Sequence, residues 1–280
     1  MERHRLVVGH SGEHNVGPVT PTRPNLTVDS GRSGCQGGRV DNRTHVREVS
    51  RVLAVAAHPD DLDFLAGGTI AGWTRAGLDV AICIVTNGDA GQLGQTPRNQ
   101  VAALRQAEAR AAARELGVGD VTFLGYSDSR VEVTLALRRD IARQIRRVRP
   151  DLVLTWAPER TRDFIRSNHP DHRAVGEATL CAIYPDAANR YIHPELHDDE
   201  GWHAWRASQA WLMGAAEPTA YVDITDTVDV KVAALRAHRS QTGHLDDLAE
   251  RIRETAAKAA LGAGLPAGRL AEVFQITPTA

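Results

Sequence analysis

Cysteine is scarce in this chain of 280 residues: it occurs three times, as Cys35, Cys83 and Cys181, with no CxxC spacing. An odd and scattered set argues against a disulfide framework and is typical of a protein kept in a reducing compartment. Cys83 lies within an apolar run, so we expect it in the core. These features lead us to expect a cytoplasmic protein.

Long hydrophobic runs and an excess of one charge are also missing. No uncharged apolar stretch approaches the roughly 18–20 residues that a transmembrane helix needs, and no apolar segment of a signal peptide follows the charged residues Glu2, Arg3 and Arg5. The formal net charge of −2 gives no general attraction to nucleic acid. We therefore expect neither a membrane nor a nucleic-acid partner.

Residues 1–48 differ in composition from the rest of the chain. They are rich in Gly, Ser, Thr, Asn, Pro, Arg and His, and no helix or strand periodicity persists in them. Such a segment has too little apolar surface to offset the entropy lost on ordering. We predict a disordered N-terminal extension over residues 1–48 and one folded domain over residues 49–280.

In the folded part, short apolar runs alternate with helical patterns. Strands are predicted at 52–56, 80–85, 121–124, 151–156, 211–214 and 220–224, and helices at 67–76, 101–116, 135–148, 172–183, 228–239 and 245–261. Continuous apolar runs are typical of strands covered on both faces, and the alternation favours parallel strands joined by helices. We predict an α/β fold: a Rossmann-like three-layer α/β/α domain with a mainly parallel sheet, plus smaller C-terminal strands and helices. In the helix 101–116, the spacing places Leu104, Ala107 and Ala111 on the apolar face.

Two clusters of histidine and aspartate follow two of these predicted strands. His58-Pro59-Asp60-Asp61 (HPDD) comes directly after the strand 52–56, and His169-Pro170-Asp171-His172 (HPDH) follows the strand 151–156. Open α/β sheets bind ligands at the carboxyl ends of their strands. Imidazole and carboxylate are zinc ligands, and a catalytic zinc takes three protein ligands and leaves one position open. The pattern predicts a metal site of His58, Asp61 and either His172 or His169.

Asp60 and Asp61 are adjacent and can take different roles. In a turn, the i, i+3 spacing of His58 and Asp61 allows both to reach one ion, and Asp60 then points elsewhere. A metal ligand must be deprotonated and directed at the ion, whereas a general base must face the attacking water. We predict Asp61 on the metal and Asp60 on the water.

Over roughly residues 50–275 the chain resembles the PIG-L/LmbE-like family of zinc-dependent N-deacetylases. The paired HPDD and HPDH motifs carry the resemblance. Supporting matches are Gly67-Gly68-Thr69 (expected as a helix start), the segment 86–91, Arg105-x-x-Glu108, and Lys231 with His238-x-Ser240-Gln241. The resemblance implies that His58, Asp61 and His172 bind one Zn²⁺, although such a ligand set also accepts Fe²⁺ or other divalent ions.

The resemblance also implies the catalytic roles. Asp60 is implied to be the base that activates water, and His169 to stabilise the oxyanion or to protonate the leaving amine. Asp171 is implied to orient and charge His169. The implied reaction is hydrolysis of an N-acyl group, first of all N-acetyl, from an amino sugar or glycoside, with release of an amine and acetate.

The sequence gives only weak indications of which residues contact the substrate. In similar enzymes an arginine in the loop after the second strand often contacts substrate, and Arg98 is the candidate here. Asp89 is placed to bind a sugar hydroxyl, or equally to cap its own turn. We expect a small-molecule N-acetyl amino sugar or glycoside as the partner; the oligomeric state, including a homo-oligomer, is left open.

Three other functions were weighed against this one. An amidase of a sugar–thiol conjugate shares the site, but Leu62-Asp63 and Ser167 depart from patterns of the mycothiol-pathway and other members. A catalytically silent Rossmann-like metal- or sugar-binding domain has no use for Asp60, which is present with all three ligands. A nucleotide-binding oxidoreductase would need GxGxxG after the first strand, where HPDD stands instead.

Overall fold

The computed structural model describes residues 6–7, 27–28, 49–91, 94–160 and 169–279. Its strands are β1 (Leu6–Val7), β2 (Thr27–Val28), β3 (Arg51–Ala56), β4 (Asp79–Thr86), β5 (Asp120–Tyr126), β6 (Leu152–Trp156), β7 (Gln209–Met213), β8 (Ala220–Asp223) and β9 (Ala271–Pro278). They form one sheet in the order β2-β1-β8-β9-β7-β6-β3-β4-β5. Strands β7, β6, β3, β4 and β5 run parallel, whereas β9 is antiparallel to both β7 and β8.

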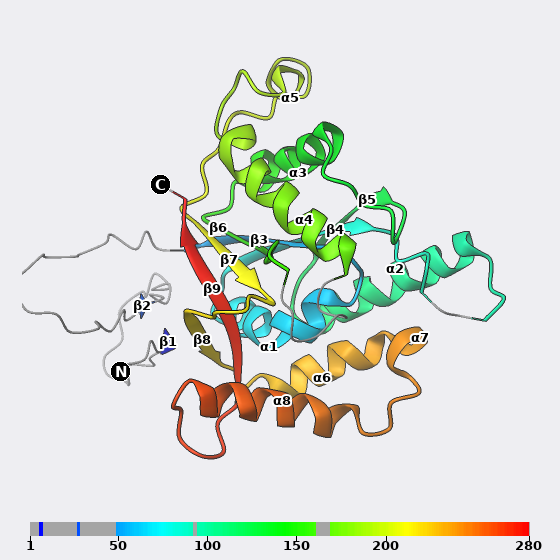
Figure 1. Cartoon of the computed structure of the whole chain (residues 1–280), viewed down its shortest axis with the longest axis vertical. Coiled ribbons are helices and arrows are strands. Elements are labelled where there is room, and N and C mark those ends of the chain that lie inside the picture. The colour runs from blue at the N-terminus through cyan, green and yellow to red at the C-terminus, as the bar shows by residue number, and fades with distance from the viewer. Residues whose placement is uncertain (1–5, 8–26, 29–48, 92–93, 161–168, 280) are drawn as a thin grey trace, which may run out of the picture.

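Helices cover both faces of this sheet (Figure 1). One face carries α1 (Asp61–Arg75), α2 (Arg98–Glu115), α6 (Val228–Ala237), α7 (Arg239–Thr242) and α8 (Leu248–Gly262). The other carries α3 (Leu135–Val148), α4 (Pro170–Cys181), the π-helical turn η2 (Ala182–Ala187) and α5 (Pro194–Asp198). The predicted three-layer α/β/α fold with a mainly parallel sheet is confirmed. None of the helices in the described part of the chain has the length and apolar composition needed to cross a bilayer.

The direction of chain winding reverses between β3 and β6. From β3 the chain moves outward through β4 to β5, and it then returns to β6 on the other side of β3. Connections that leave two neighbouring strands in opposite directions open a crevice at their carboxyl ends. His58 lies just past the end of β3, Trp156 ends β6, and His169 directly precedes α4. The topology therefore brings the two His/Asp clusters to one place.

Helix α1 begins at Asp61, well before the predicted start at residue 67. Gly67 and Gly68 consequently lie inside the helix and not at its start. A Cβ added at Gly68 would meet the side chain of Ile224 at 2.7 Å, and one at Gly67 would meet Lys231 Cγ at 3.2 Å. A glycine inside a helix lowers the free energy of unfolding by about 0.5–1 kcal/mol relative to alanine. Here the two glycines permit the close approach of Ile224 and of Lys231 in α6.

Helix α2 turns a different face to the protein than its apolar spacing predicted. Leu104 and Ala107 are exposed and Ala111 is half-buried, whereas Arg105 and Glu108 are buried. The prediction was wrong because it counted only apolar residues, whereas Arg105 and Glu108 turn inward to partners that are distant in sequence, Asp60 and Ser240.

Two very short strands occur where the sequence showed no periodicity. β1 pairs in parallel with β8 (Leu6 opposite Val222), and β2 pairs antiparallel with β1. A two-residue strand carries no pattern that a sequence reveals. The predicted disorder of the rest of residues 1–48 falls outside the described residues.

Helix α4 approaches β6 closely at Gly176, where an added Cβ would lie 2.4 Å from the carbonyl oxygen of Trp156. We expect Gly176→Ala to lower the free energy of unfolding by about 1–3 kcal/mol, because the helix must move away from the strand. The control is Gly72→Ala in α1, where an added Cβ meets nothing within 4 Å; it should be neutral or stabilising by about 0.5–1 kcal/mol. Urea unfolding measures both, and equal stabilities would contradict this account of the packing.

Candidate metal centre and active site

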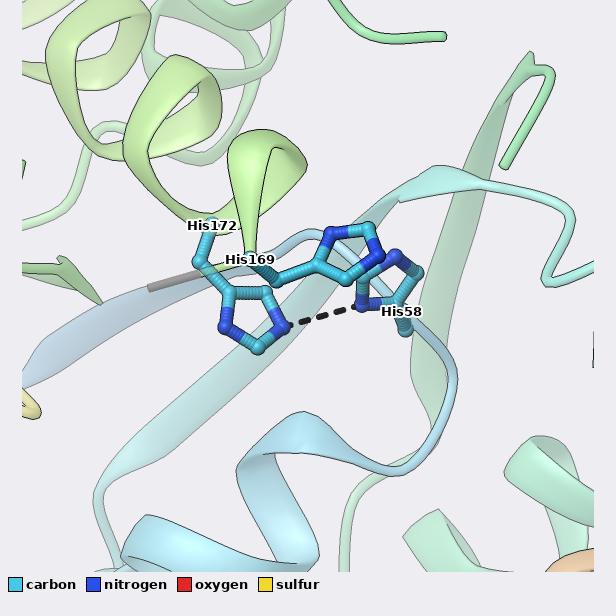
Figure 2. A group of neighbouring side chains, drawn as sticks. All are labelled: His58, His169 and His172. Carbon is cyan, nitrogen blue, oxygen red and sulfur yellow. Dashed lines mark hydrogen bonds between the residues drawn. The ribbon is translucent and has the colours of Figure 1, made fainter. Parts of the chain in front are cut away.

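Three side chains converge at the carboxyl ends of β3 and β6. His58 Nδ1 lies 3.0 Å from His172 Nε2, and Asp61 Oδ1 lies 3.5 Å from the first and 3.3 Å from the second. Figure 2 shows the two imidazoles facing each other, with His169 beside them. A tetrahedral ion with bonds of about 2.0–2.1 Å separates its ligand atoms by about 3.3 Å. The triangle therefore has the size and the donor types that suit a divalent metal ion.

Asp61 is held so that one oxygen faces the two imidazoles. Its Oδ2 accepts hydrogen bonds from the backbone N–H groups of Ala57 (3.0 Å) and His58 (2.9 Å) and from Trp156 Nε1 (2.9 Å). Burial alone would raise the pKa of Asp61, but the imidazoles of His58 and His172 hold it well below its usual range. The carboxylate is therefore ionised, as a metal ligand must be.

Trp156 also fixes His172. The indole stacks on the imidazole with ring centroids 3.7 Å apart and planes inclined by 10°. Trp156 is buried at the end of β6. One side chain therefore sets the orientation of both Asp61 and His172.

The second nitrogen of His58 faces two carboxylates. Nε2 lies 3.3 Å from Asp171 Oδ2 and 3.4 Å from Asp128 Oδ1, and all three residues are buried. Burial alone would lower the pKa of His58, but Asp61, Asp128 and Asp171 together raise it to about 12. Carboxylates on the far nitrogen of a metal-binding histidine fix its tautomer and its orientation. We therefore attribute the Asp128–Asp171 pair to orienting His58.

Asp171 was expected to orient and charge His169, but its carboxylate forms its hydrogen bonds with other groups. Its carboxylate accepts hydrogen bonds from the backbone N–H groups of Ser129 (2.7 Å) and Val131 (3.3 Å) and faces His58, not His169. His169 is contacted by the backbone of Asp171, whose N–H donates to His169 Nδ1 at 3.2 Å. The reason is that Asp171 lies in the first turn of α4, with its side chain directed toward β3 and its N–H toward the preceding residues.

His169 is held in one tautomer by this contact. Because Nδ1 accepts a hydrogen bond, the ring proton of the neutral imidazole is on Nε2. Burial lowers the pKa of His169, and the neighbouring imidazole of His58 lowers it further. The ring centroids of His169 and His58 are 4.8 Å apart. A neutral N–H donor thus lies next to the imidazole of His58.

Asp60 directly precedes Asp61 in the chain and is bound by an arginine. Arg105 is buried, and its guanidinium donates to Asp60 Oδ1 at 2.9 Å and to the Gly88 carbonyl oxygen at 3.0 Å. Gly88 has a φ of +62°, and an added Cβ would lie 2.7 Å from the Arg105 guanidinium. The turn after β4 therefore requires glycine at this position to leave room for the arginine that orients Asp60.

Asp89 and Arg98, the two predicted substrate-binding residues, are paired with each other. Arg98 Nε donates to Asp89 Oδ2 at 2.9 Å. Both residues line two neighbouring open cavities of about 420 and 510 Å³. The structure thus places the pair at the edge of a space large enough for a small ligand.

Known proteins are similar to this chain in sequence and in fold. The family model PIG-L, described as GlcNAc-PI de-N-acetylase, matches residues 53–183. The diacetylchitobiose deacetylase of Thermococcus kodakarensis is 31% identical over 198 residues, which are 69% of this chain and 71% of that protein. The probable N-acetyl-alpha-D-glucosaminyl L-malate deacetylase 2 of Bacillus cereus is 31% identical over 72% of this chain and 89% of its own.

The chain belongs to the PIG-L family. The solved structure of the N,N'-diacetylchitobiose deacetylase of Pyrococcus horikoshii, in complex with an inhibitor, matches with a TM-score of 0.75 and 28% identity, covering 85% of this chain and 87% of that one. The predicted resemblance is therefore confirmed. The similarity extends beyond the matched family model into the C-terminal strands and helices.

The structure of this PIG-L protein adds residues to the site that sequence reasoning missed. Asp128 follows β5 and Trp156 ends β6, so both lie at the sheet edge where ligands bind, and that position was the available signal. Arg105 is inside a helix, and only its place in a family motif pointed to it. Ser167, where some PIG-L members carry a tyrosine, lies outside the described residues.

Trp156→Phe tests whether the hydrogen bond from the indole to Asp61 supports metal binding. The ring stacking on His172 is kept and the donor to Asp61 is lost, so we expect metal binding to weaken about tenfold, at the lower end of effects of outer residues on metal sites. The control is Trp73→Phe, a buried indole whose Nε1 has no hydrogen-bond partner among the described residues; it should bind metal like the wild type. Zinc competition against a chelator of known affinity measures this, and equal affinity in all three proteins would contradict it.

Proposed function

We propose that this protein is a zinc-dependent N-deacetylase that hydrolyses the N-acetyl group of an N-acetylglucosamine unit in a small saccharide or glycoside. The observation that carries the proposal is the triangle of His58, Asp61 and His172 in a chain of the PIG-L family, with Asp60 directly before Asp61 in the sequence. The two curated relatives are named for deacetylation of diacetylchitobiose and of an N-acetylglucosaminyl malate. N-acetylglucosamine is the part that these substrates share.

His58 Nδ1, Asp61 Oδ1 and His172 Nε2 are the proposed metal ligands. Zinc suits three nitrogen and oxygen donors with one position open, and Fe²⁺ or another divalent ion accepts the same donors. When bound, zinc polarises the acetamide carbonyl and lowers the pKa of a coordinated water to about 7. The protein supplies the fixed directions of the three donor atoms, since Asp61 and both imidazoles are held by further contacts.

Asp60 is the proposed general base. It is adjacent to Asp61 in the chain, and Arg105 holds one of its oxygens at 2.9 Å. It takes a proton from the attacking water as the new carbon–oxygen bond forms. That proton then passes to the nitrogen, the carbon–nitrogen bond breaks, and the amine and acetate leave.

His169 is proposed to stabilise the negative charge that develops on the carbonyl oxygen. Its Nδ1 is occupied by the backbone N–H of Asp171, so Nε2–H is the available donor. A neutral imidazole can donate this hydrogen bond over the whole neutral pH range. A fixed donor directed at a developing oxyanion is worth about 10²–10³ in kcat in other hydrolases.

The cavities along Asp89 and Arg98 are proposed to accept the sugar or aglycone beyond the acetamido group. Their lining is rich in polar side chains: besides this ion pair it includes Thr96, Asn87, Asn99 and Gln106. Hydroxyl-rich ligands bind through such groups. Neither lining includes His58, Asp61 or His172, so the proposal places the sugar or aglycone in these cavities, and not the acetamido group.

Asp60→Asn separates catalysis from metal binding. We expect wild-type zinc content and a loss of at least about 100-fold in kcat, because general-base catalysis contributes about 10²–10⁴-fold. The control is Asp79→Asn, an exposed residue at the opposite end of the parallel strands, which should be fully active. Zinc is measured by mass spectrometry and amine release is measured with N-acetylglucosamine, N,N'-diacetylchitobiose and N-acetylglucosaminyl malate.

Undiminished turnover in Asp60→Asn would overturn the role of Asp60. A zinc-loaded wild type that releases no amine from any N-acetylglucosaminide, but cleaves the amide of a sugar–thiol conjugate, would overturn the substrate class in favour of the amidase.

Zinc binding should depend on pH through His58. Since the surrounding carboxylates raise the pKa of His58 to about 12, the metal must displace a proton at neutral pH, and the apparent Kd should fall about tenfold for each unit of rising pH. The same proton stabilises the metal-free fold: its contribution is complete below the ordinary value of 6.5 and is lost as pH rises toward 12. Titrations at pH 6, 7 and 8 measure the affinity; a Kd that does not change would contradict the assignment.

A further inference from the structure

The Asp89–Arg98 ion pair makes a second set of contacts, to the backbone of Asp128. Asp89 Oδ1 accepts a hydrogen bond from the Asp128 N–H at 2.8 Å, and Arg98 donates to the Asp128 carbonyl oxygen at 3.4 Å. Within the pair, Arg98 Nε and Asp89 Oδ2 are 2.9 Å apart. The two side chains therefore hold both backbone polar groups of one residue.

Asp128 lies where the chain offers little regular support. It follows β5 in a turn, and the next residue, Ser129, has a φ of +64°. A left-handed conformation is uncommon for residues other than glycine and persists where surrounding contacts enforce it. The hydrogen bond that Asp89 accepts from the Asp128 N–H and the one that Arg98 donates to the Asp128 carbonyl oxygen are contacts of this kind. The Ser129 hydroxyl adds another, which it donates to Asp128 Oδ1 at 3.0 Å.

The carboxylate of Asp128 reaches two parts of the active site. Oδ1 lies 3.4 Å from His58 Nε2, and Oδ2 lies 3.7 Å from a guanidinium nitrogen of Arg105. Arg105 in turn binds Asp60. A shift of the Asp128 turn would change both the acceptor behind a proposed metal ligand and the surroundings of the proposed base.

We infer that Asp89 and Arg98 are positioning residues for the metal centre and that they act through Asp128. The inference rests on the proposed role of His58 as a metal ligand. The ion pair ties the loop after β4 and the start of α2 to the turn after β5, and thereby holds the Asp128 carboxylate against His58 Nε2. This role requires no contact between either side chain and the substrate.

Asp89 and Arg98 are suited to this test because their loss should leave the fold intact. The Arg98 side chain is 50% exposed and that of Asp89 is 14% exposed, and an ion pair with one partner this exposed is expected to contribute only modestly to the free energy of unfolding. The informative variants are Arg98→Met, which keeps the aliphatic stem, Asp89→Asn, which keeps the side-chain shape, and Asp128→Ala. The readouts are the rate of zinc release to a chromogenic chelator, and KM and kcat measured separately with N,N'-diacetylchitobiose.

We expect Asp128→Ala to speed zinc release about 10–100-fold, as for other residues that support a metal ligand. Arg98→Met and Asp89→Asn should each speed it by a smaller, severalfold factor and lower kcat more than they raise KM. The double variant Arg98→Met/Asp128→Ala should release zinc at the rate of Asp128→Ala alone, because residues that act through one partner are not additive.

If Arg98 only contacts the substrate, the expected result is different. Arg98→Met would then raise KM, would leave zinc release unchanged, and would keep its full effect on KM in the Asp128→Ala background; this outcome overturns the inference. Arg251→Met, which breaks the exposed Arg251–Asp247 pair in α8, is the matched control and should change neither readout.

The same measurements distinguish this inference from the proposed function. A wild type that binds no zinc contradicts the metal centre itself. A wild type that binds zinc, with release accelerated by Asp128→Ala but by neither Arg98→Met nor Asp89→Asn, contradicts only the positioning role of the ion pair.

Discussion

Three hydrogen bonds to one oxygen of Asp61 are the constraint on which the rest of the site depends. Two donors are backbone N–H groups of the turn after β3, and the third is the indole of Trp156 at the end of β6. They join the two strands at which the chain reverses its winding. A buried carboxylate without partners would strongly destabilise the fold, and these three donors prevent that. Because they hold Oδ2, they also direct Oδ1 toward the two imidazoles. The same indole stacks on His172, and the triangle of donor atoms follows from these contacts.

Several carboxylates lie close to this triangle. Each of them contacts a buried basic side chain, either the His58 imidazole or the Arg105 guanidinium. Asp61, Asp128 and Asp171 surround one imidazole, and Arg105 lies between Asp60 and Asp128. Buried charges require such partners, because isolated ones are costly to remove from water. This explains why α2 turns an arginine inward while it leaves a leucine exposed. A divalent ion would add positive charge where the carboxylates and the ligand atoms converge.

Much of the fold could be read from the sequence because its strands are covered on both faces. β3 and β6 are buried almost throughout, so each appears as a continuous apolar run. The start of α1 and the buried face of α2 could not be read in this way. Gly67 and Gly68 lie inside α1, where they leave room for Lys231 and Ile224, more than 150 residues away in the chain, and Arg105 is buried against Asp60. Both are tertiary contacts that outweigh local preference.

The sequence by itself indicated His58, Asp60, Asp61 and either His169 or His172 as candidate ligand and catalytic residues, since HPDD and HPDH each follow a strand and strand ends of a parallel sheet lie at one edge. The choice of His172 as the ligand came from the resemblance to the PIG-L family. Only the tertiary structure decided which carboxylate serves which imidazole. Asp171 is two residues from His169 in the chain, yet its side chain faces His58, 113 positions away. The direction of a side chain is set by the helix or strand that carries it and by the partners that surround it, and sequence spacing alone does not contain that information.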